Sequence, residues 1–423
     1  MAVGTATVTV ERLDDALHVL RGGSFVQILA ESGHGAEFTA ALAHGSVLHL
    51  DGQAHFERRR LLALLFRRKV LLDYEHAVLI PALERISRDI GRAVSDGSGE
   101  PGRDGGGLRL DLLRLCREAF VDLFSRLVGF EGLETPEARS EFLTDFHAYE
   151  IGFRAKYVAD PATAVEHALA AKDRILARHF DAPWRRRADA LASGGDDHAL
   201  PDDLMTLLLR HRDHYAQWGD DAAWQEAMLF MVASIGSTGN AICHAVADLL
   251  DWTGGDASRA DQLGDPAFLS RAFRDSVRLH QTNHLLRTAI EDVVLPSGTA
   301  VPAGAVVAVD RAAVNRELEA RSDAPEQRFA PDRVLEDGLR DHGLSFGDGP
   351  HSCIGRTMVL GDRGTRRSGQ EEDGLEGLAV ATLQHLFKAG VERISDDPPT
   401  RVGDMAREMW DRFPVVMGRR ETA

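Results

Sequence analysis

Cysteine is scarce in this sequence, which has only Cys116, Cys243 and Cys353 among its 423 residues. Three thiols cannot form a disulfide framework, so the composition predicts a protein of a reducing compartment. The first residues, MAVGTATVTVERLDD, lack a basic stretch followed by an apolar one, and we expect no signal peptide. Together these features predict a cytoplasmic protein.

Positive charge is also in short supply. Lys and Arg number 49 against 66 Asp and Glu, which gives a formal net charge of −17. An acidic chain argues against nucleic-acid binding, which calls for a basic face. High net charge favours solubility and does not determine the fold.

Long apolar runs are nearly absent. One segment, 228–247, has no Asp, Glu, Lys or Arg and is about long enough to cross a membrane. Its centre consists of Ser, Gly, Thr and Asn. We therefore predict a long helix through the interior of a protein that does not associate with a membrane.

Helical patterns dominate the first two thirds of the chain. Apolar residues recur at helical spacing in 11–23, 54–72 and 110–129. Strand patterns come late, in 289–310, where Pro-Ser-Gly and Pro-Ala-Gly turns interrupt them. The sequence predicts a mainly α fold with a small β-sheet, in one large domain over residues 1–423. Loop insertions rich in glycine and charge are expected near 95–107 and 361–377.

The stretch HGLSFGDGPHSCIG, residues 342–355, places Cys353 among glycines just ahead of an apolar run. Glycines let the backbone approach a flat ligand and let amide N–H groups point at the sulfur. Such amides, together with the N-terminus of a following helix, stabilise a thiolate, and a thiolate is a good axial ligand for haem iron. On these residues alone, a buried inert cysteine and a nucleophilic cysteine also remain open.

The pattern Phe346-x-x-Gly349-x-x-x-Cys353-x-Gly355 resembles the signature of the cytochrome P450 family, the haem-thiolate monooxygenases. Further segments resemble that family in the right order, from about residue 11 to the C-terminus, and the soluble bacterial type fits best. They are DGQAHFERRR (51–60) for its C helix, FMVASIGSTGNAI (230–242) for its central I helix, DSVR (275–278) for its Glu-x-x-Arg, and QRFAPDR (327–333) for its meander.

The resemblance implies a cofactor and a set of residues that hold it. Haem b would be bound through Cys353, the metal ligand, in a loop shaped by Phe346, Gly349 and Gly355. Its propionates would be contacted by His55, Arg59, Arg287 and His351. Arg328 would complete the ion network of Asp275 and Arg278.

Three departures from the family pattern bear on the chemistry. Asp275 is one methylene shorter than the usual glutamate, which concerns stability. Gly236 stands where the I helix usually has an acid, with Ser237 at the usual threonine and Thr238 next to it. A glycine cannot relay a proton, so Ser237 and Thr238 are the candidate catalytic residues, or protons arrive by another route. The insertion at 361–377 would lie on the face where an electron donor docks.

The resemblance implies monooxygenation of a small organic substrate of secondary metabolism, using O2 and electrons from a ferredoxin or flavodoxin with its reductase. Substrate would contact 22–49, 234–238 and the polar stretch after Arg278. Two alternatives stay open. One is a haem-thiolate enzyme of another kind, namely a peroxygenase, a dehydratase or isomerase, or a nitrogen-group transferase. The other is a non-catalytic binding module of the same fold.

Overall fold

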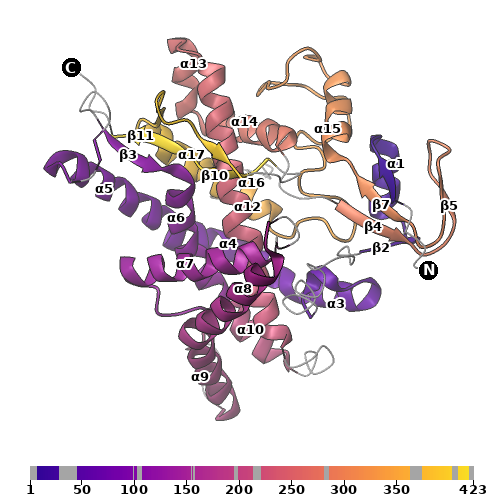
Figure 1. The fold of residues 1–423 in the computed structure, drawn as a ribbon, viewed down its shortest axis with the longest axis horizontal. Helices are drawn as coiled ribbons and strands as arrows, with labels where there is room; N and C mark the ends of the chain where they lie inside the picture. Colours follow the sequence, from indigo (N-terminus) through magenta and orange to yellow (C-terminus); the bar gives the residue numbers. More distant parts are fainter. Residues whose placement is uncertain are drawn as a thin grey trace, which may run out of the picture. The chain divides into compact units, whose positions relative to one another are not determined.

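The computed structural model describes residues 7–27, 45–98, 100–101, 107–153, 155, 158–194, 199–212, 221–280, 285–362, 374–402 and 408–418. It is mainly helical with short strands, as predicted (Figure 1). The helices are α1 (Leu13–Arg21), α3 (Gly52–Leu62), α4 (Arg68–Tyr74), α5 (Ile80–Asp96), α6 (Leu112–Val128), α7 (Pro136–Gly152), α8 (Pro161–Ile175), α9 (Asp181–Ala192), α10 (Leu204–Arg210), α12 (Ala222–Thr253), α13 (Ala257–Ala260), α14 (Pro266–Leu279), α15 (Arg311–Ala320), α16 (Arg356–Leu360) and α17 (Leu378–Lys388).

The strands are short and form several small sheets. They are β1 (Thr7–Val10), β2 (Phe25–Gln27), β3 (Leu108–Asp111), β4 (Leu285–Ala289), β5 (Val293–Val294), β6 (Ala300–Val301), β7 (Val306–Val309), β8 (Glu392–Arg393), β9 (Thr400–Arg401), β10 (Trp410–Arg412) and β11 (Pro414–Met417).

The contacts within the chain divide it into two compact units. The first comprises residues 1–26, 71–119 and 237–423, and the second comprises 27–70 and 120–236. The single haem-binding domain over residues 1–423 therefore stays a prediction.

The largest sheet of the first unit has the strand order β1-β7-β4-β2. β7 pairs in parallel with β1, with Thr7 opposite Val306, and antiparallel with β4, with Arg287 opposite Val307. Side chains alternate along β7, so that Val307 and Val309 are buried while their neighbours are half-buried. These valines join a core that includes residues of α1 and α15. The sheet thereby gives β4 a fixed position from which to present Arg287.

The early strands β1 and β2, and β3 in a second sheet of the same unit, correct the expectation that strands come late in the chain. β11 lies between β3 and β8, with Met417 opposite Leu108 (Figure 1). The helical pattern over 110–129 includes the end of β3, and there the prediction is wrong. Asp111 ends the strand, because its Oδ1 accepts hydrogen bonds from the backbone N–H groups of Leu113 (3.1 Å) and Phe413 (3.0 Å). The helix therefore begins only at Leu112.

Helix α12 is the long interior helix that the sequence predicts. It has 32 residues, and among the described residues it is the one helix apolar and long enough to cross a membrane. Of its most apolar window, 72% is buried within the protein, as in a core helix. Gly239 allows close packing with α6, since a Cβ there would lie 3.3 Å from Leu113 Cδ1.

The second unit is built around α7 and α8, which pack along each other. Both helices begin with a side-chain cap: Thr135 Oγ1 accepts from the Ala138 N–H, and Asp160 Oδ1 accepts from the Thr163 N–H. Phe142 stacks on Phe146 at 5.7 Å between ring centres, and both rings are almost fully buried. These contacts give the unit its own apolar core.

The helix that follows Cys353 is short. α16 ends at Leu360 and α17 begins at Leu378, and residues 363–373 lie outside the described part of the chain. Asp362 and Leu375 exchange backbone hydrogen bonds where the interruption opens and closes. The buried Glu75 carboxylate accepts from the Gly377 N–H (2.7 Å) and the Glu376 N–H (3.0 Å). The Glu75 carboxylate therefore anchors the start of α17, which also packs against the end of α16. The other predicted insertion, near 95–107, falls between α5 and β3, and residues 99 and 102–106 are likewise outside the described part.

Candidate haem-thiolate site

The loop that carries Cys353 is held by its own backbone. The Cys353 N–H donates to the Phe346 carbonyl at 2.7 Å, and the Ser352 N–H donates to the Gly349 carbonyl at 3.1 Å. The helix that follows, α16, is short, so its dipole contributes less to a thiolate than the sequence suggested. The position of the Cys353 sulfur is therefore determined mainly by the hydrogen-bonded turns of the loop itself.

Gly349 is required by the position of the loop against α1. Its φ is +68°, and a Cβ at this residue would lie 2.1 Å from the Leu20 carbonyl oxygen. The neighbouring Asp348 binds Arg21 Nε at 2.7 Å and Arg340 Nη1 at 3.0 Å. Burial opposes the ionised form of this carboxyl, but the Arg21 hydrogen bond and the Gly349 N–H outweigh it and lower the pKa of Asp348. The loop is thus fixed on one side by a close contact and on the other by ion pairs.

A buried network of ion pairs and hydrogen bonds around Arg278 supports the same loop. Arg278, 1% exposed, binds Asp275 Oδ1 and Glu319 Oε1, each at 2.8 Å. Asn315 links the network to the loop, since its Oδ1 accepts from the Leu344 N–H (3.0 Å) and its Nδ2 donates to the Arg278 carbonyl (2.8 Å). The shorter acid at Asp275 therefore still forms the predicted pair with Arg278.

The prediction that Arg328 is the third member of this network is wrong. Arg328 is exposed and contributes only its backbone carbonyl, which accepts from Arg278 Nη2 at 2.9 Å. Arg333 supplies the guanidinium instead, with Nε 3.5 Å from Asp275 Oδ1. Both arginines lie in the segment QRFAPDR, and its turn directs the second one inward.

Cys353 is the cysteine that a ligand can reach. It is exposed, whereas Cys116 and Cys243 are both fully buried. Burial raises the pKa of Cys243 well above its usual value, which keeps that thiol protonated and inert. An accessible thiol on a hydrogen-bonded glycine turn fits a haem ligand.

The predicted propionate ligands divide between the two units. Arg287, on β4, is 4% exposed, and its Nη1 donates to the Leu286 carbonyl at 2.8 Å. His351 is half-buried in the Cys353 loop of the same unit. His55 and Arg59 lie one turn apart on α3 in the second unit, with His55 buried and Arg59 half-buried. That these four residues meet one cofactor stays a prediction.

The candidate catalytic hydroxyls lie on α12, as expected. Ser237 is half-buried and Thr238 is 6% exposed. Gly236 precedes them within the unbroken helix, so this position carries no side chain that could donate a proton. The polar stretch 281–284 and most of the segment 22–49, both predicted to contact substrate, lie outside the described residues.

The sequence interpretation missed a buried ion pair beside the predicted C-helix residues. Arg58 Nη1 binds Glu226 Oε1 at 2.5 Å, and both side chains are fully buried. Glu226 also accepts from the Val47 N–H at 2.6 Å, and Arg58 donates to the Gly45 carbonyl at 3.2 Å. Burial raises the pKa of Glu226 to about 7, although Arg58 and the Val47 N–H oppose this rise. The sequence signal was an acid, Glu226, two residues before the uncharged segment 228–247.

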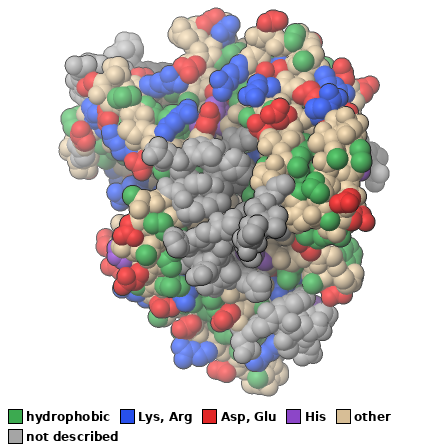
Figure 2. All heavy atoms as spheres, turned by 45° about the vertical axis from the view of Figure 1, so that its right-hand side comes forward, with side chains coloured by type: hydrophobic (Ala, Val, Ile, Leu, Met, Phe, Trp, Pro, Cys, Tyr) green, Lys and Arg blue, Asp and Glu red, His purple; other side chains and the backbone are tan. Residues whose placement is uncertain are grey.

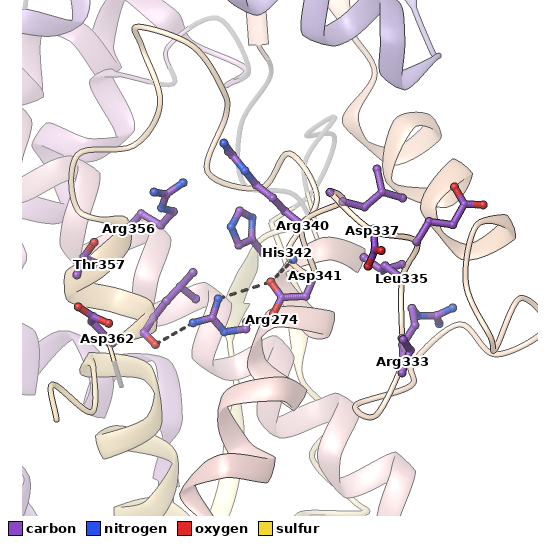
Figure 3. A pocket seen from close by; sticks show the side chains of 16 residues that line it. Arg274, Arg333, Leu335, Asp337, Arg340, Asp341, His342, Arg356, Thr357 and Asp362 are labelled. Carbon is purple, nitrogen blue, oxygen red and sulfur yellow. Dashed lines mark hydrogen bonds and ion pairs between the residues drawn. The ribbon is translucent and has the colours of Figure 1, made fainter. Parts of the chain in front are cut away.

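A cavity of about 720 Å³ opens beside the Cys353 loop (Figure 3). Four arginines line it, balanced by four acidic residues. Arg274 Nη1 lies 3.5 Å from Asp341 Oδ1, and its Nη2 donates to the Leu360 carbonyl at 3.4 Å. The cavity is neutral overall although the chain carries a net charge of −17. The arginines are Arg274, Arg333, Arg340 and Arg356, and the acids are Glu336, Asp337, Asp341 and Asp362.

The charges elsewhere are mixed. Figure 2 shows Lys and Arg side chains interspersed with Asp and Glu over the described residues of the face it presents. No single-sign patch dominates that face of the described chain.

Comparison with known proteins agrees with the geometry. The family model "Cytochrome P450" matches residues 255–359, which include Asp275, Arg278 and Cys353. The rat (Rattus norvegicus) protein "Cytochrome P450 4F5" is 26% identical over 214 residues, which is 43% of this chain and 40% of the rat protein. The match thus spans less than half of that relative's length.

Solved structures match over nearly the whole chain. P450 EryK, determined as a mutant in complex with erythromycin B, superimposes with a TM-score of 0.65 at 19% identity, over 98% of this chain and 92% of that one. The hydroxylase HmtN, involved in himastatin biosynthesis, superimposes with a TM-score of 0.65 at 19% identity, over 97% and 90%. These likenesses confirm the predicted fold.

Proposed function

We propose that the chain is a cytochrome P450 and acts as a haem-thiolate monooxygenase on a small organic substrate, supported by the family model over residues 255–359 and by the shared fold. The observation that carries the proposal is the exposed Cys353 on a rigid glycine turn, in a chain whose other two cysteines are fully buried. The family implies a haem, and we propose haem b with Cys353 as its axial ligand. Bound haem supplies O2 binding and activation, which thiolate ligation favours.

The other residues of the site would hold and orient the cofactor. Arg287 and His351 are proposed to bind the propionates from the first unit, and His55 and Arg59 from the second. Such cation-to-carboxylate contacts are charge-assisted, worth on the order of 1.5–3 kcal/mol each. Phe346, Gly349 and Gly355 would shape the loop.

The proposed reaction consumes two protons and two electrons. It converts R–H and O2 into R–OH and water, and both protons must reach the site from solvent. In the absence of an acid at Gly236, we assign proton handling to the hydroxyls of Ser237 and Thr238, either of which can hold a water. A polar group on the substrate could share this task.

Electrons are proposed to come from a separate ferredoxin or flavodoxin with its reductase. The cavity lined by Arg274 and Arg356 supports this proposal, because it lies beside the Cys353 loop and is neutral on an otherwise acidic chain. Such a region repels an acidic redox protein less than the surrounding surface does. We also propose that the substrate belongs to secondary metabolism, which is supported by the erythromycin and himastatin enzymes of the same fold. A cytoplasmic location is proposed as well, supported by the scarcity of cysteine.

Gly236 favours a second candidate function, a haem-thiolate reaction that needs no proton relay from α12. Peroxide brings its own protons, so a peroxygenase would not require the missing acid. A dehydratase or isomerase, a nitrogen-group transferase and a non-catalytic binding module remain further possibilities.

One experiment separates these functions. Purified protein is first screened for substrates by the spin-state shift of its Soret band, and a hit is then incubated either with O2, NADPH, ferredoxin and reductase, or with peroxide alone. Hydroxylated product in the first incubation supports monooxygenation, and product in the second alone supports peroxygenation. Substrate binding without product in either would support the remaining candidates.

A further inference from the structure

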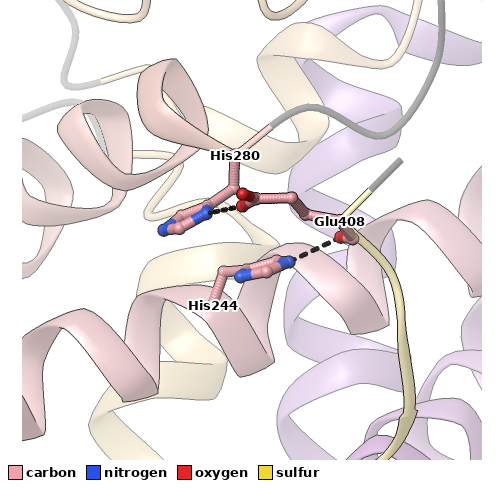
Figure 4. A group of neighbouring side chains, drawn as sticks. All are labelled: His244, His280 and Glu408. Atoms are coloured by element: carbon pink, nitrogen blue, oxygen red, sulfur yellow. Dashed lines mark hydrogen bonds and ion pairs between the residues drawn. The ribbon is translucent and has the colours of Figure 1, made fainter. Parts of the chain in front are cut away.

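Two histidines and a glutamate from three separate segments meet in the first unit (Figure 4). His244 lies on α12, His280 directly follows α14, and Glu408 shortly precedes β10. His280 Nδ1 lies 2.6 Å from Glu408 Oε2, and His244 Nε2 lies 2.7 Å from the Glu408 carbonyl oxygen. One potential ligand atom from each residue lies within 4.8 Å of the other two.

A second carboxylate contacts the other ring nitrogen of His280. Asp248 Oδ2 lies 3.1 Å from His280 Nε2, the ring nitrogen opposite Glu408, and it accepts a hydrogen bond of 2.6 Å from Ser276 Oγ. Metal-binding histidines commonly have such a carboxylate on the other ring nitrogen, where it fixes the orientation and tautomer of the ring. The order Asp248, His280, Glu408 therefore matches an outer carboxylate, a histidine ligand and a carboxylate ligand.

The cluster is largely removed from solvent, and the imidazole of His280 lies between two carboxylates. The His280 side chain is 11% exposed and that of Asp248 16%, while His244 is 1% exposed as a residue. Burial opposes a charged imidazole, but the hydrogen bonds to Asp248 and Glu408 outweigh it and raise the pKa of His280 to about 9. Burial, together with the neighbouring cation, lowers the pKa of His244 to about 4, so that ring is neutral. A proton on His280 is thus the cation between the two carboxylates.

We propose that His244, His280 and Glu408 bind one Zn²⁺ ion, with Asp248 orienting His280 from its other ring nitrogen. Two imidazoles and a carboxylate are a ligand set that zinc accepts, with water completing the coordination. On binding, the proton on His280 passes to solvent. His280 Nδ1 and Glu408 Oε2 must then separate from their 2.6 Å hydrogen bond, because two ligand atoms each about 2.0 Å from a tetrahedral zinc ion lie farther apart than this. The site is independent of the proposed oxygenation chemistry, and its consequence is structural: the ion would tie the β9–β10 region to α12 and α14.

The side chain of His244 must also turn for the ion to bind. The rings of His244 and His280 are stacked, with centroids 4.0 Å apart and planes 11° apart, so their lone pairs do not converge. His244 must rotate and release the Glu408 carbonyl for its nitrogen to face the ion. Arg401 Nη1, 3.6 Å from Glu408 Oε1, binds the carboxylate oxygen that the ion does not use.

The test uses tag-free, haem-loaded protein that has been treated with a chelator and then dialysed. Titration calorimetry with ZnCl2 should detect one site in the wild type and none in Glu408→Gln. Asp248→Asn keeps all three ligands and should weaken zinc affinity by about 10- to 100-fold, the usual cost of losing an outer carboxylate. His76→Gln, at an exposed histidine of the same unit, is the matched control and should bind zinc as the wild type does. Zinc should also raise the melting temperature of the wild type and not that of Glu408→Gln.

Two results would overturn the proposal: a wild type without a zinc site, or a site that Glu408→Gln retains. Either would mean that the cluster is a network held by a proton alone. The Soret band and the far-UV CD spectrum show whether each variant is folded. If Glu408→Gln does not fold, the decision passes to Asp248→Asn, in which unchanged zinc affinity would reject the site.

Discussion

The pH dependence of stability that Glu226 contributes shows whether desolvation or the ion pair with Arg58 has the stronger effect on its carboxyl. Its carboxyl is fully buried against Arg58, and burial raises its pKa from 4.5 to about 7. A group whose pKa is raised on folding binds its proton more tightly in the folded state. Stability therefore falls as pH rises from about 4.5 through 7, because the folded state must give up a proton that the unfolded state has already lost. Glu226→Gln, which keeps the shape and cannot ionise, removes this pH dependence.

The magnitude follows from the two pKa values. A pKa difference of one between the folded and unfolded states corresponds to about 1.4 kcal/mol, so the full penalty on ionised Glu226 is on the order of 3 kcal/mol. Part of this penalty is already present at pH 6.0, and the change between pH 6.0 and 8.5 is on the order of 1 kcal/mol. Over this interval, the free energy of unfolding of Glu226→Gln should rise by that amount relative to the wild type.

Urea unfolding followed by far-UV CD at pH 6.0 and 8.5 measures this difference. Other titrating groups, including the 18 histidines, cancel between wild type and variant. Glu84→Gln is the control, because the side chain of Glu84 is 55% exposed. If Glu226→Gln instead loses stability relative to the wild type as pH rises, the Arg58 ion pair outweighs desolvation and the reasoning is refuted.

Three further predictions concern residues around the proposed haem site. Arg333→Ala should lower the free energy of unfolding by about 3–5 kcal/mol, since it removes a partner of the buried Asp275, whereas Arg328→Ala, at an exposed side chain, should change it by less than about 0.5 kcal/mol. Equal effects of the two variants in urea unfolding would contradict the corrected network. Gly349→Ala should reduce haem occupancy far more than Gly347→Ala. Both glycines have a positive φ, but only at Gly349 would a Cβ clash with the Leu20 carbonyl. Equal haem occupancy of the two variants, measured as the ratio of Soret to protein absorbance, would contradict this prediction. Ser237→Val with Thr238→Val should slow product formation much more than it weakens substrate binding, and Gly236→Glu should not raise turnover; normal turnover by the double variant would place the proton relay elsewhere.

Local patterns could be predicted from the sequence. The Cys353 loop could be predicted because glycine, proline and cysteine determine a tight turn within a dozen residues. The long α12 helix could be predicted because the segment 228–247 contains no Asp, Glu, Lys or Arg. The pair of Asp275 and Arg278 could also be predicted, since residues three apart on a helix lie on one face.

What could not be predicted depends on partners far along the chain. Arg58 and Arg59 are adjacent on α3 and differ in direction by about 100°, so only the position of Glu226 shows which one is buried in an ion pair. β1 is a four-residue strand whose partner, β7, lies far along the chain, with Thr7 opposite Val306. The cluster of His244, His280 and Glu408 comes from three distant segments, and no spacing in the sequence indicates it.

The central claim is that Cys353 ligates haem as a thiolate, and the spectrum of the reduced, CO-bound protein tests it most directly. The wild type should show the red-shifted Soret band of a thiolate-ligated haem, and Cys116→Ala and Cys243→Ala should keep it, because both side chains are buried away from any ligand. Cys353→Ala and Cys353→His should abolish that band. A wild type without the red-shifted band, or a Cys353 variant that retains it, would contradict the account.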